Sequence, residues 1–198
     1  MRYKDIYSNN LVNRLNLTFN DIIINSNLDD VEKIPVEKMV KKLNWEVKYG
    51  DSIHTDFDRH VITILKPDKY TPANHKPAHI DNTYALGRVV ATEFYIHLNR
   101  LINVDLNEPN IVRDTFIDSF TKQLIAPKNL VNNLANDVID ALETTNGSFT
   151  TNDIYTIGYR VSNLLEVDTD LVLSQLDIPG MVGYLSQSVV KDDTDTII

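Results

Sequence analysis

The chain has 198 residues, of which 42% are hydrophobic and 24% are charged, so it can bury the core of one globular domain. Its formal charge of −9 argues against broad contact with nucleic acid, because phosphate binding draws most of its affinity from Lys and Arg. The lack of cysteine excludes disulfides and thiolate-held zinc, and no segment predicts a membrane span or a signal peptide. We therefore expect a cytoplasmic protein that is not associated with a membrane.

The N-terminal third mixes irregular segments with two predicted strands. Residues 1–33 show no clean apolar period and predict an irregular lead-in. Pro35, followed by apolar residues at helical spacing, predicts a short amphipathic helix. The alternating segment Trp45–Tyr49 and the apolar run His60–Leu65 predict two strands, which we expect to pair as a hairpin with a long turn. Residues 66–77 contain three prolines and predict a loop.

The rest of the chain has the periodicity of helices. We expect helices at about 82–101, 110–125, 128–143, 151–164 and 168–176. The last two resemble a helix-turn-helix, but a DNA-reading helix exposes basic or amide groups, whereas residues 168–175 contain two acids and no Lys or Arg. We expect this pair to serve packing, with docking of a protein left open. The whole pattern predicts an α+β fold, with a small antiparallel sheet or hairpin packed against helices.

The segment Arg113–Pro127 carries a helical pattern marked by Phe120, Leu124, Ile125 and Pro127. In type and spacing these residues match the second helix of the ImmA/IrrE family of metallopeptidases, which are associated with phages and mobile elements, so the segment resembles that family. The order of elements is also similar over three further segments, which are Ile34–Val47, Val61–Ile64 and Tyr159–Leu176. The resemblance covers about residues 34–178 of the sequence. It implies a zincin-type domain at 34–143, a helix-turn-helix-like segment at 144–186 and an acidic tail at 187–198.

The zinc motif of that family is degenerate in this chain. In H-E-x-x-H, two histidines four residues apart share one helix face and bind zinc, while the glutamate takes a proton from the bound water. In the register that aligns Ala91 and Glu93 with the family's A-H-E, the ligand positions hold Thr92 and Ile96, and Asp114 stands for the third ligand. Glu93 is then a vestigial general base. Because one carboxylate cannot hold a catalytic zinc, this register implies a pseudoenzyme without a metal cofactor.

A second register, shifted by one residue, aligns Arg88 and His97 with the family's motif. It gives a possible set of two carboxylates and one histidine, Glu93, His97 and Asp114, for zinc or another divalent metal. This set lacks the usual proton acceptor, because Phe94 takes the place of the base. Both registers stay open, and the burial pattern of the helix favours the first.

Each candidate residue also has a structural interpretation. Glu93 is equally typical of a carboxylate that is hydrogen-bonded within the fold, and His97 of an ordinary helix residue. Asp114 follows a Pro-Asn turn and is at least as typical of a cap at a helix N-terminus. The other histidines are scattered through loops and a strand start and predict no site; they are His54, His60, His75 and His79.

The resemblance implies a protein partner, because active members of the family cleave helix-turn-helix repressors encoded beside them. The first hypothesis is a catalytically inactive protein that regulates phage or mobile-element genes by binding a repressor or another regulatory protein. The alternative is a metal-dependent endopeptidase with an altered metal site that cleaves such a repressor. Direct binding to nucleic acid is not expected in either case.

Overall fold

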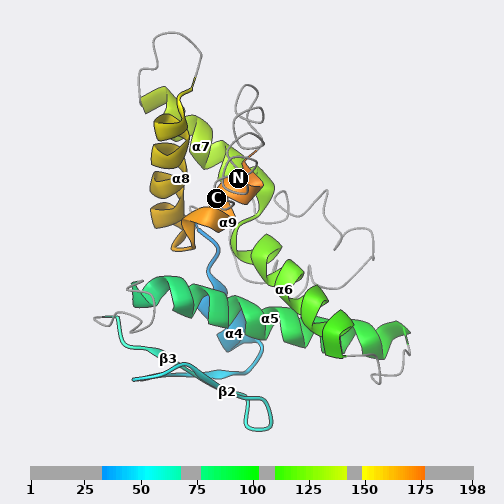
Figure 1. Cartoon of the computed structure of the whole chain (residues 1–198). Coiled ribbons are helices and arrows are strands. Elements are labelled where there is room, and N and C mark those ends of the chain that lie inside the picture. Colours follow the sequence, from blue (N-terminus) through cyan, green and yellow to red (C-terminus); the bar gives the residue numbers. More distant parts are fainter. Residues whose placement is uncertain (1–32, 68–76, 103–109, 142–148, 177–198) are drawn as a thin grey trace, which may run out of the picture.

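The computed structural model describes residues 33–67, 77–102, 110–141 and 149–176, without the side chains of 97–102 and 110–112 (Figure 1). The predicted lead-in and the acidic tail therefore lie outside the described residues. The elements in chain order are α4 (Val36–Lys42), β1 (Glu46–Gly50), β2 (His54–Asp56), β3 (Val61–Leu65), α5 (Ala78–Ile102), α6 (Asn110–Ile125), α7 (Lys128–Ala141), α8 (Thr151–Leu165) and α9 (Thr169–Gln175). The predicted α+β class is confirmed.

The three strands form one mixed sheet with the order β1-β3-β2. β1 runs parallel to β3, and β2 pairs with β3 in the antiparallel direction. The predicted hairpin between Trp45–Tyr49 and His60–Leu65 is therefore wrong. β2 carries the chain back antiparallel, so that β3 can run in the same direction as β1. This strand was missed because it is short and polar and lies within a stretch that has the composition of a turn.

Two helices cover one face of the sheet. α4 contacts β1, and α5 contacts both β3 and α4. The Asn82 side chain ties the start of α5 to the end of β3, because its amide oxygen accepts from the Leu65 backbone N–H and its nitrogen donates to the Leu65 carbonyl, both at 2.8 Å. α5 begins at Ala78, earlier than the predicted start at about residue 82. The prediction missed this first turn because residues 78–81 lack the apolar spacing by which the rest of the helix was recognised in the sequence.

The crossing of α5 and α6 forms the centre of the core. At Gly87 the two helices approach each other closely, since a Cβ atom there would be 2.6 Å from Ile125 Cγ2. Farther along, the rings of Phe94 and Phe120 stack with their centroids 4.7 Å apart. Phe120, Leu124 and Ile125 are buried, so their prediction as core residues is confirmed.

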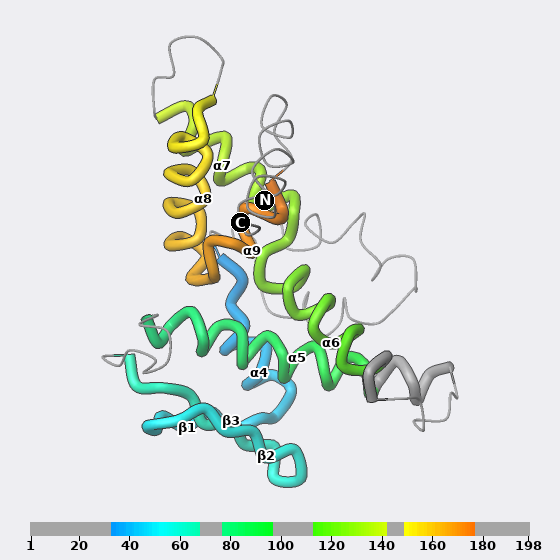
Figure 2. Tube along the Cα trace, viewed as in Figure 1, coloured from blue at the N-terminus to red at the C-terminus, as the bar shows by residue number. Residues whose placement is uncertain are grey.

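The last three helices pack together, away from the sheet. α7 contacts both α8 and α9, and the Figure 2 trace shows this group and the sheet at opposite ends, with α5 and α6 between them. Thr150 and Asp153 form a capping box at the start of α8, and Asp168 caps α9. α8 and α9 meet closely at Gly158, where a Cβ atom would lie 2.6 Å from Leu173 Cδ2. Among the described helices, none is both long and apolar enough to cross a membrane.

Candidate functional site

A cleft of about 770 Å³ opens between the edge strand β2 and the helices α5 and α6. We call it the main cleft. One wall comes from β2 and its flanks, through Ile53, Thr55 and Phe57. The residues from α5 include Arg88, Val89, Thr92, Tyr95 and Ile96, and those from α6 are Arg113, Asp114 and Ile117. The cleft therefore joins segments that are about sixty residues apart in the sequence.

The three positions of the first register lie together in this cleft. Thr92 and Ile96 are one turn apart on α5, and Asp114 is contributed by α6. Residues four apart on a helix share one face, which explains why both α5 positions line the same space. The geometry thus brings together the positions that the resemblance assigns to the zinc ligands.

The side chains at these positions do not fit a catalytic zinc, which needs three protein ligands. The Thr92 hydroxyl donates to the Arg88 carbonyl oxygen at 2.8 Å, and Ile96 has no donor atom for a metal. Asp114 is the one carboxylate of the three, and its Oδ1 accepts from Arg113 Nε at 3.4 Å. Across the described part of the chain, no group of three or more His, Cys, Asp or Glu side chains is arranged to hold a metal ion.

Glu93 faces away from the main cleft and supports the sheet. Its Oε1 accepts a hydrogen bond of 3.1 Å from Nε1 of Trp45, and Nε2 of His60 lies 3.8 Å from the same oxygen. Glu93 is not among the residues that line the cleft. These contacts match the structural interpretation of this carboxylate. His60 had been left out of any site, because its sequence position, 33 residues before Glu93, gives no signal of this contact.

The structure does not show the three residues of the second register, Glu93, His97 and Asp114, as one site. His97 belongs to α5, and its side chain lies outside the described residues. Glu93 contacts Trp45, whereas Asp114 lines the main cleft. Asp114 is also not a helix cap, because α6 begins at Asn110 and its first turn contains no acidic residue.

The rim of the main cleft carries apolar side chains that the sequence interpretation passed over. Ile53 is 38% exposed and Phe57 is 42% exposed, although both are large and apolar. The Phe57 ring packs edge-on against Trp45 with the centroids 5.0 Å apart, so it is held in place while one side faces the cleft. The sequence did offer a signal for this rim, because Ile53 and Phe57 are two large apolar residues within a polar turn. Such a rim, above walls that include Val89 and Ile117, can bury an apolar side chain of a partner.

Tyr84 lines the main cleft and also belongs to a network of polar side chains with Asp118 and Lys122. The Tyr84 hydroxyl donates to Asp118, and Lys122 Nζ lies 2.8 Å from Asp118 Oδ2. Hydrogen bonds from Lys122 and Tyr84 hold the pKa of Asp118 below its usual value. Burial, followed by the hydrogen bond to Asp118, raises the pKa of Tyr84. Both shifts favour the charged carboxylate and the neutral phenol.

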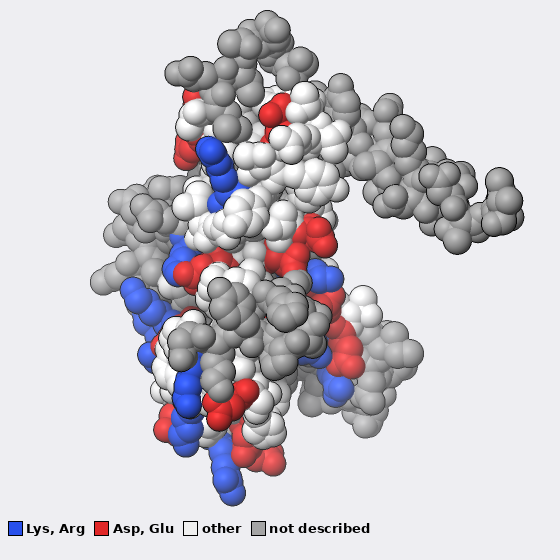
Figure 3. Space-filling model, turned by 60° about the vertical axis from the view of Figure 1, so that its left-hand side comes forward, with Lys and Arg blue, Asp and Glu red and all other residues white. Residues whose placement is uncertain are grey.

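Comparison with known proteins does not assign a function. No family model, curated protein or solved structure matches this chain. The view in Figure 3 shows acidic and basic side chains interspersed over the lower part of that face and a mainly uncharged upper part. Among the described residues on this face, Lys and Arg therefore do not form a continuous basic surface of the kind that binds a phosphate backbone.

Proposed function

We propose that this chain is a catalytically inactive ImmA/IrrE-like protein that binds a repressor or another regulatory protein of a phage or mobile element. The binding takes place in the main cleft. The observation that supports this proposal is the main cleft, whose lining combines apolar side chains such as Val89 and Ile117 with charged ones from α5 and α6. In it, Thr92 and Ile96 stand where the resemblance expects zinc ligands, and neither offers a ligand set for zinc. Such a protein acts in the cytoplasm, where the regulator is found.

Binding changes a regulator's activity only if the regulator's active and inactive states differ in their affinity for the protein. The main cleft lies beside a sheet edge and has apolar walls, which suits a segment that is exposed in one state and buried in the other. Sequestration of that state lowers the fraction of regulator available to DNA. No bond needs to be cleaved.

Titration calorimetry with a helix-turn-helix repressor encoded beside the gene tests this function. Ile96→Glu replaces an apolar wall of the main cleft with a carboxylate and is expected to weaken binding at least about tenfold, because the partner loses an apolar contact and must desolvate a charge. Leu164→Glu is the matched control, since Leu164 is 52% exposed on α8. Equal affinity of the two variants, or no binding by the wild type, would contradict the proposal.

The competing function, a metal-dependent endopeptidase, is separated by analysing the metal content and the repressor after incubation. The binding function predicts an intact repressor with or without added zinc. A stoichiometric metal that is lost in Asp114→Ala and Glu93→Ala, together with cleaved repressor, would instead establish the enzyme.

A further inference from the structure

The outer side of α8 carries a stripe of exposed side chains that is separate from the main cleft. The other side of α8 faces α7 and α9 and buries apolar residues such as Ile154 and Val161. Figure 3 brings this side of the molecule forward and shows a mainly uncharged surface over its upper part. We call the exposed and half-buried residues of the outer side the α8 stripe; they are Asn152, Asp153, Tyr155, Tyr159, Arg160 and Asn163.

Two tyrosines form one edge of the α8 stripe. Tyr155 is 53% exposed and Tyr159 is 62% exposed, and residues four apart on a helix are neighbours on one face. Tyrosine combines a large apolar ring with a polar tip and is enriched at protein interfaces. No residue of α8 lines the main cleft, so binding there leaves both rings uncovered.

The other edge of the α8 stripe carries one charge of each sign. Asp153 and Arg160 are seven residues apart, which is nearly two turns of the helix. Oδ2 of Asp153 accepts from the N–H and the hydroxyl of Thr150, at 2.8 and 2.7 Å, and within the described residues Oδ1 accepts no hydrogen bond. Arg160 is exposed and forms no ion pair in the described part of the chain. Each edge charge can therefore pair with an opposite charge from outside.

The α8 stripe is nearly symmetric about the level of Ile157. Tyr155 and Tyr159 lie two residues before and after it, and Asp153 and Arg160 lie four before and three after. A two-fold axis at this level pairs the helix with an antiparallel copy and keeps each edge on its own side. Tyr155 then meets Tyr159 of the second copy, and Asp153 meets Arg160 of the second copy. A parallel copy would instead oppose like charges.

We propose that a second copy of this chain docks antiparallel on the α8 stripe, about a two-fold axis near Ile157. A single pair of helices, each about 22 Å long, forms a small interface, so we expect a reversible dimer with a Kd of about 10–100 µM. The dimer does not depend on the proposed function. Both main clefts remain outside the contact, so substitutions on the α8 stripe do not touch the surface that binds the repressor.

Sedimentation velocity of the full chain, at concentrations from well below to well above the expected Kd, measures the dimer. Arg160→Glu opposes Asp153 of the second copy with a like charge, twice in each dimer, and is expected to weaken dimerisation at least about tenfold. Lys38→Glu, at an exposed position of α4, is the matched control, because it changes the net charge by the same amount. It is expected to leave the dimer unchanged.

Introduced cysteines test the antiparallel register without a background, since the natural chain has no cysteine. Thr156→Cys lies next to the two-fold axis, so its thiol faces that of the second copy. Asn163→Cys lies on the same stripe, but its thiols are about 18 Å apart along the helix pair, beyond the reach of a disulfide. Under mild oxidation, followed on non-reducing gels, we expect Thr156→Cys to form covalent dimers at least about tenfold faster than Asn163→Cys.

A wild-type chain that stays monomeric over the whole concentration range would overturn the inference, and this measurement needs no variant. Equal weakening by Arg160→Glu and Lys38→Glu would overturn it as well, because net charge and not the edge pair would then control association. Cross-linking of Asn163→Cys that is as fast as that of Thr156→Cys would rule out the antiparallel register. Circular dichroism checks that the variants fold, and titration of the repressor judges the proposed function separately.

Discussion

At the scale of single residues, Glu93 serves the fold, although the resemblance assigns it to a catalytic motif. Its carboxylate holds the indole N–H of Trp45, and Trp45 in turn packs against Phe57 at the rim of the main cleft. Through Trp45, Glu93 therefore supports the rim of the main cleft. A residue retained for this reason needs an acceptor oxygen but no proton-transfer chemistry.

This role predicts different effects for two substitutions of Glu93. Glu93→Ala leaves the buried indole N–H of Trp45 without its acceptor and is expected to lower the free energy of unfolding by about 1–3 kcal/mol. Glu93→Gln keeps an acceptor oxygen and is expected to cost less than about 1 kcal/mol. Urea unfolding, followed through the fluorescence of Trp45, the one tryptophan of the chain, measures both. Equal stability of Glu93→Ala and the wild type would refute the structural role.

The contact of α5 with α6 at Gly87 gives a second prediction. Gly87→Ala would place its Cβ 2.6 Å from Ile125 Cγ2 and 3.3 Å from Thr121 Cγ2. Although alanine favours a helix by about 1 kcal/mol over glycine, we expect overpacking to dominate and to cost about 1–3 kcal/mol. Thr115→Ala, at an exposed position of α6, is the control in the same urea measurement. A more stable Gly87→Ala variant would mean that the helices separate without penalty.

Asp118 predicts a dependence of stability on pH. Its pKa is lowered in the folded state, so its contribution is fully present above the unfolded value of about 3.9 and is lost as the pH falls through the folded value. The difference in unfolding free energy between the wild type and Asp118→Asn should therefore shrink between about pH 6 and about pH 2.5. Urea unfolding at both pH values measures it. A difference that stays constant would show that the charge of Asp118 does not matter.

At the scale of elements, the helices were more predictable from the sequence than the sheet. The amphipathic stripes of α7 and α8 and the apolar residues of α6 mark their positions, because each helix buries a stripe of its own. The direction of β1 relative to β3 was not predictable in this way. It depends on β2, a strand of three polar residues that is held by its pairing with β3 and not by burial.

The candidate site was predictable only in part for the same reason. Thr92, Ile96 and Asp114 were chosen from the resemblance, and the spacing of Thr92 and Ile96 on one helix explains why both line the same cleft. The wall that β2 provides could not be anticipated, since no sequence pattern brings Ile53 and Phe57 next to α5. Likewise, the contact between Trp45 and Glu93 joins two elements whose relative positions are set by the whole sheet.

The edge strand β2 gives a further prediction, through Phe57, which follows it directly. Phe57→Ser removes the aromatic rim of the main cleft and is expected to weaken repressor binding about tenfold or more, because aromatic residues often dominate interfaces. Tyr159→Ser, on the exposed face of α8, is the control, and titration calorimetry measures both. A larger loss with Tyr159→Ser would move the binding surface to the helical end of the molecule.

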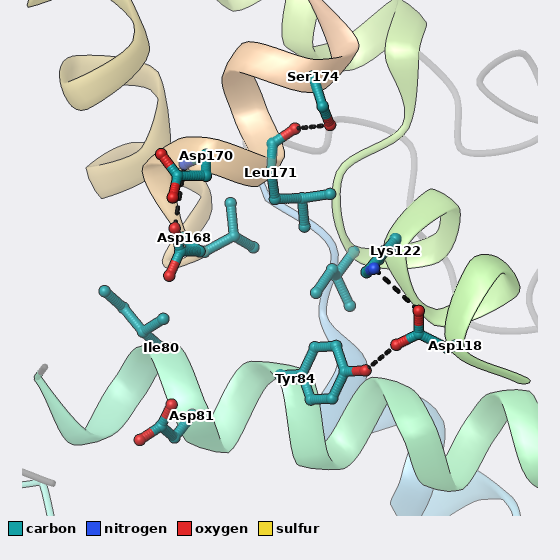
Figure 4. Close-up of a pocket in the computed structure, with 11 residues that line it drawn as sticks. Ile80, Asp81, Tyr84, Asp118, Lys122, Asp168, Asp170, Leu171 and Ser174 are labelled. Atoms are coloured by element: carbon teal, nitrogen blue, oxygen red, sulfur yellow. Dashed lines mark hydrogen bonds and ion pairs between the residues drawn. The ribbon is translucent and has the colours of Figure 1, made fainter. Parts of the chain in front are cut away.

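At the scale of the whole molecule, α5 and α6 connect two ends with different surfaces. The sheet end contributes the apolar rim of the main cleft, and α9 contributes to a second cavity, of about 550 Å³, that it lines together with α5 and α6 (Figure 4). Both concavities meet at Asp81 and Tyr84 on α5. A partner that binds across this helix therefore contacts elements from both ends of the chain.

Hydrogen exchange of the full chain, with and without the repressor, tests the central claim most directly, because it locates the bound surface without any substitution. The account predicts slower exchange at residues 53–57, in the middle of α5 and in the first half of α6, with no change on the outer face of α8. Protection confined to α8, or no protection at all at a saturating repressor concentration, would contradict it.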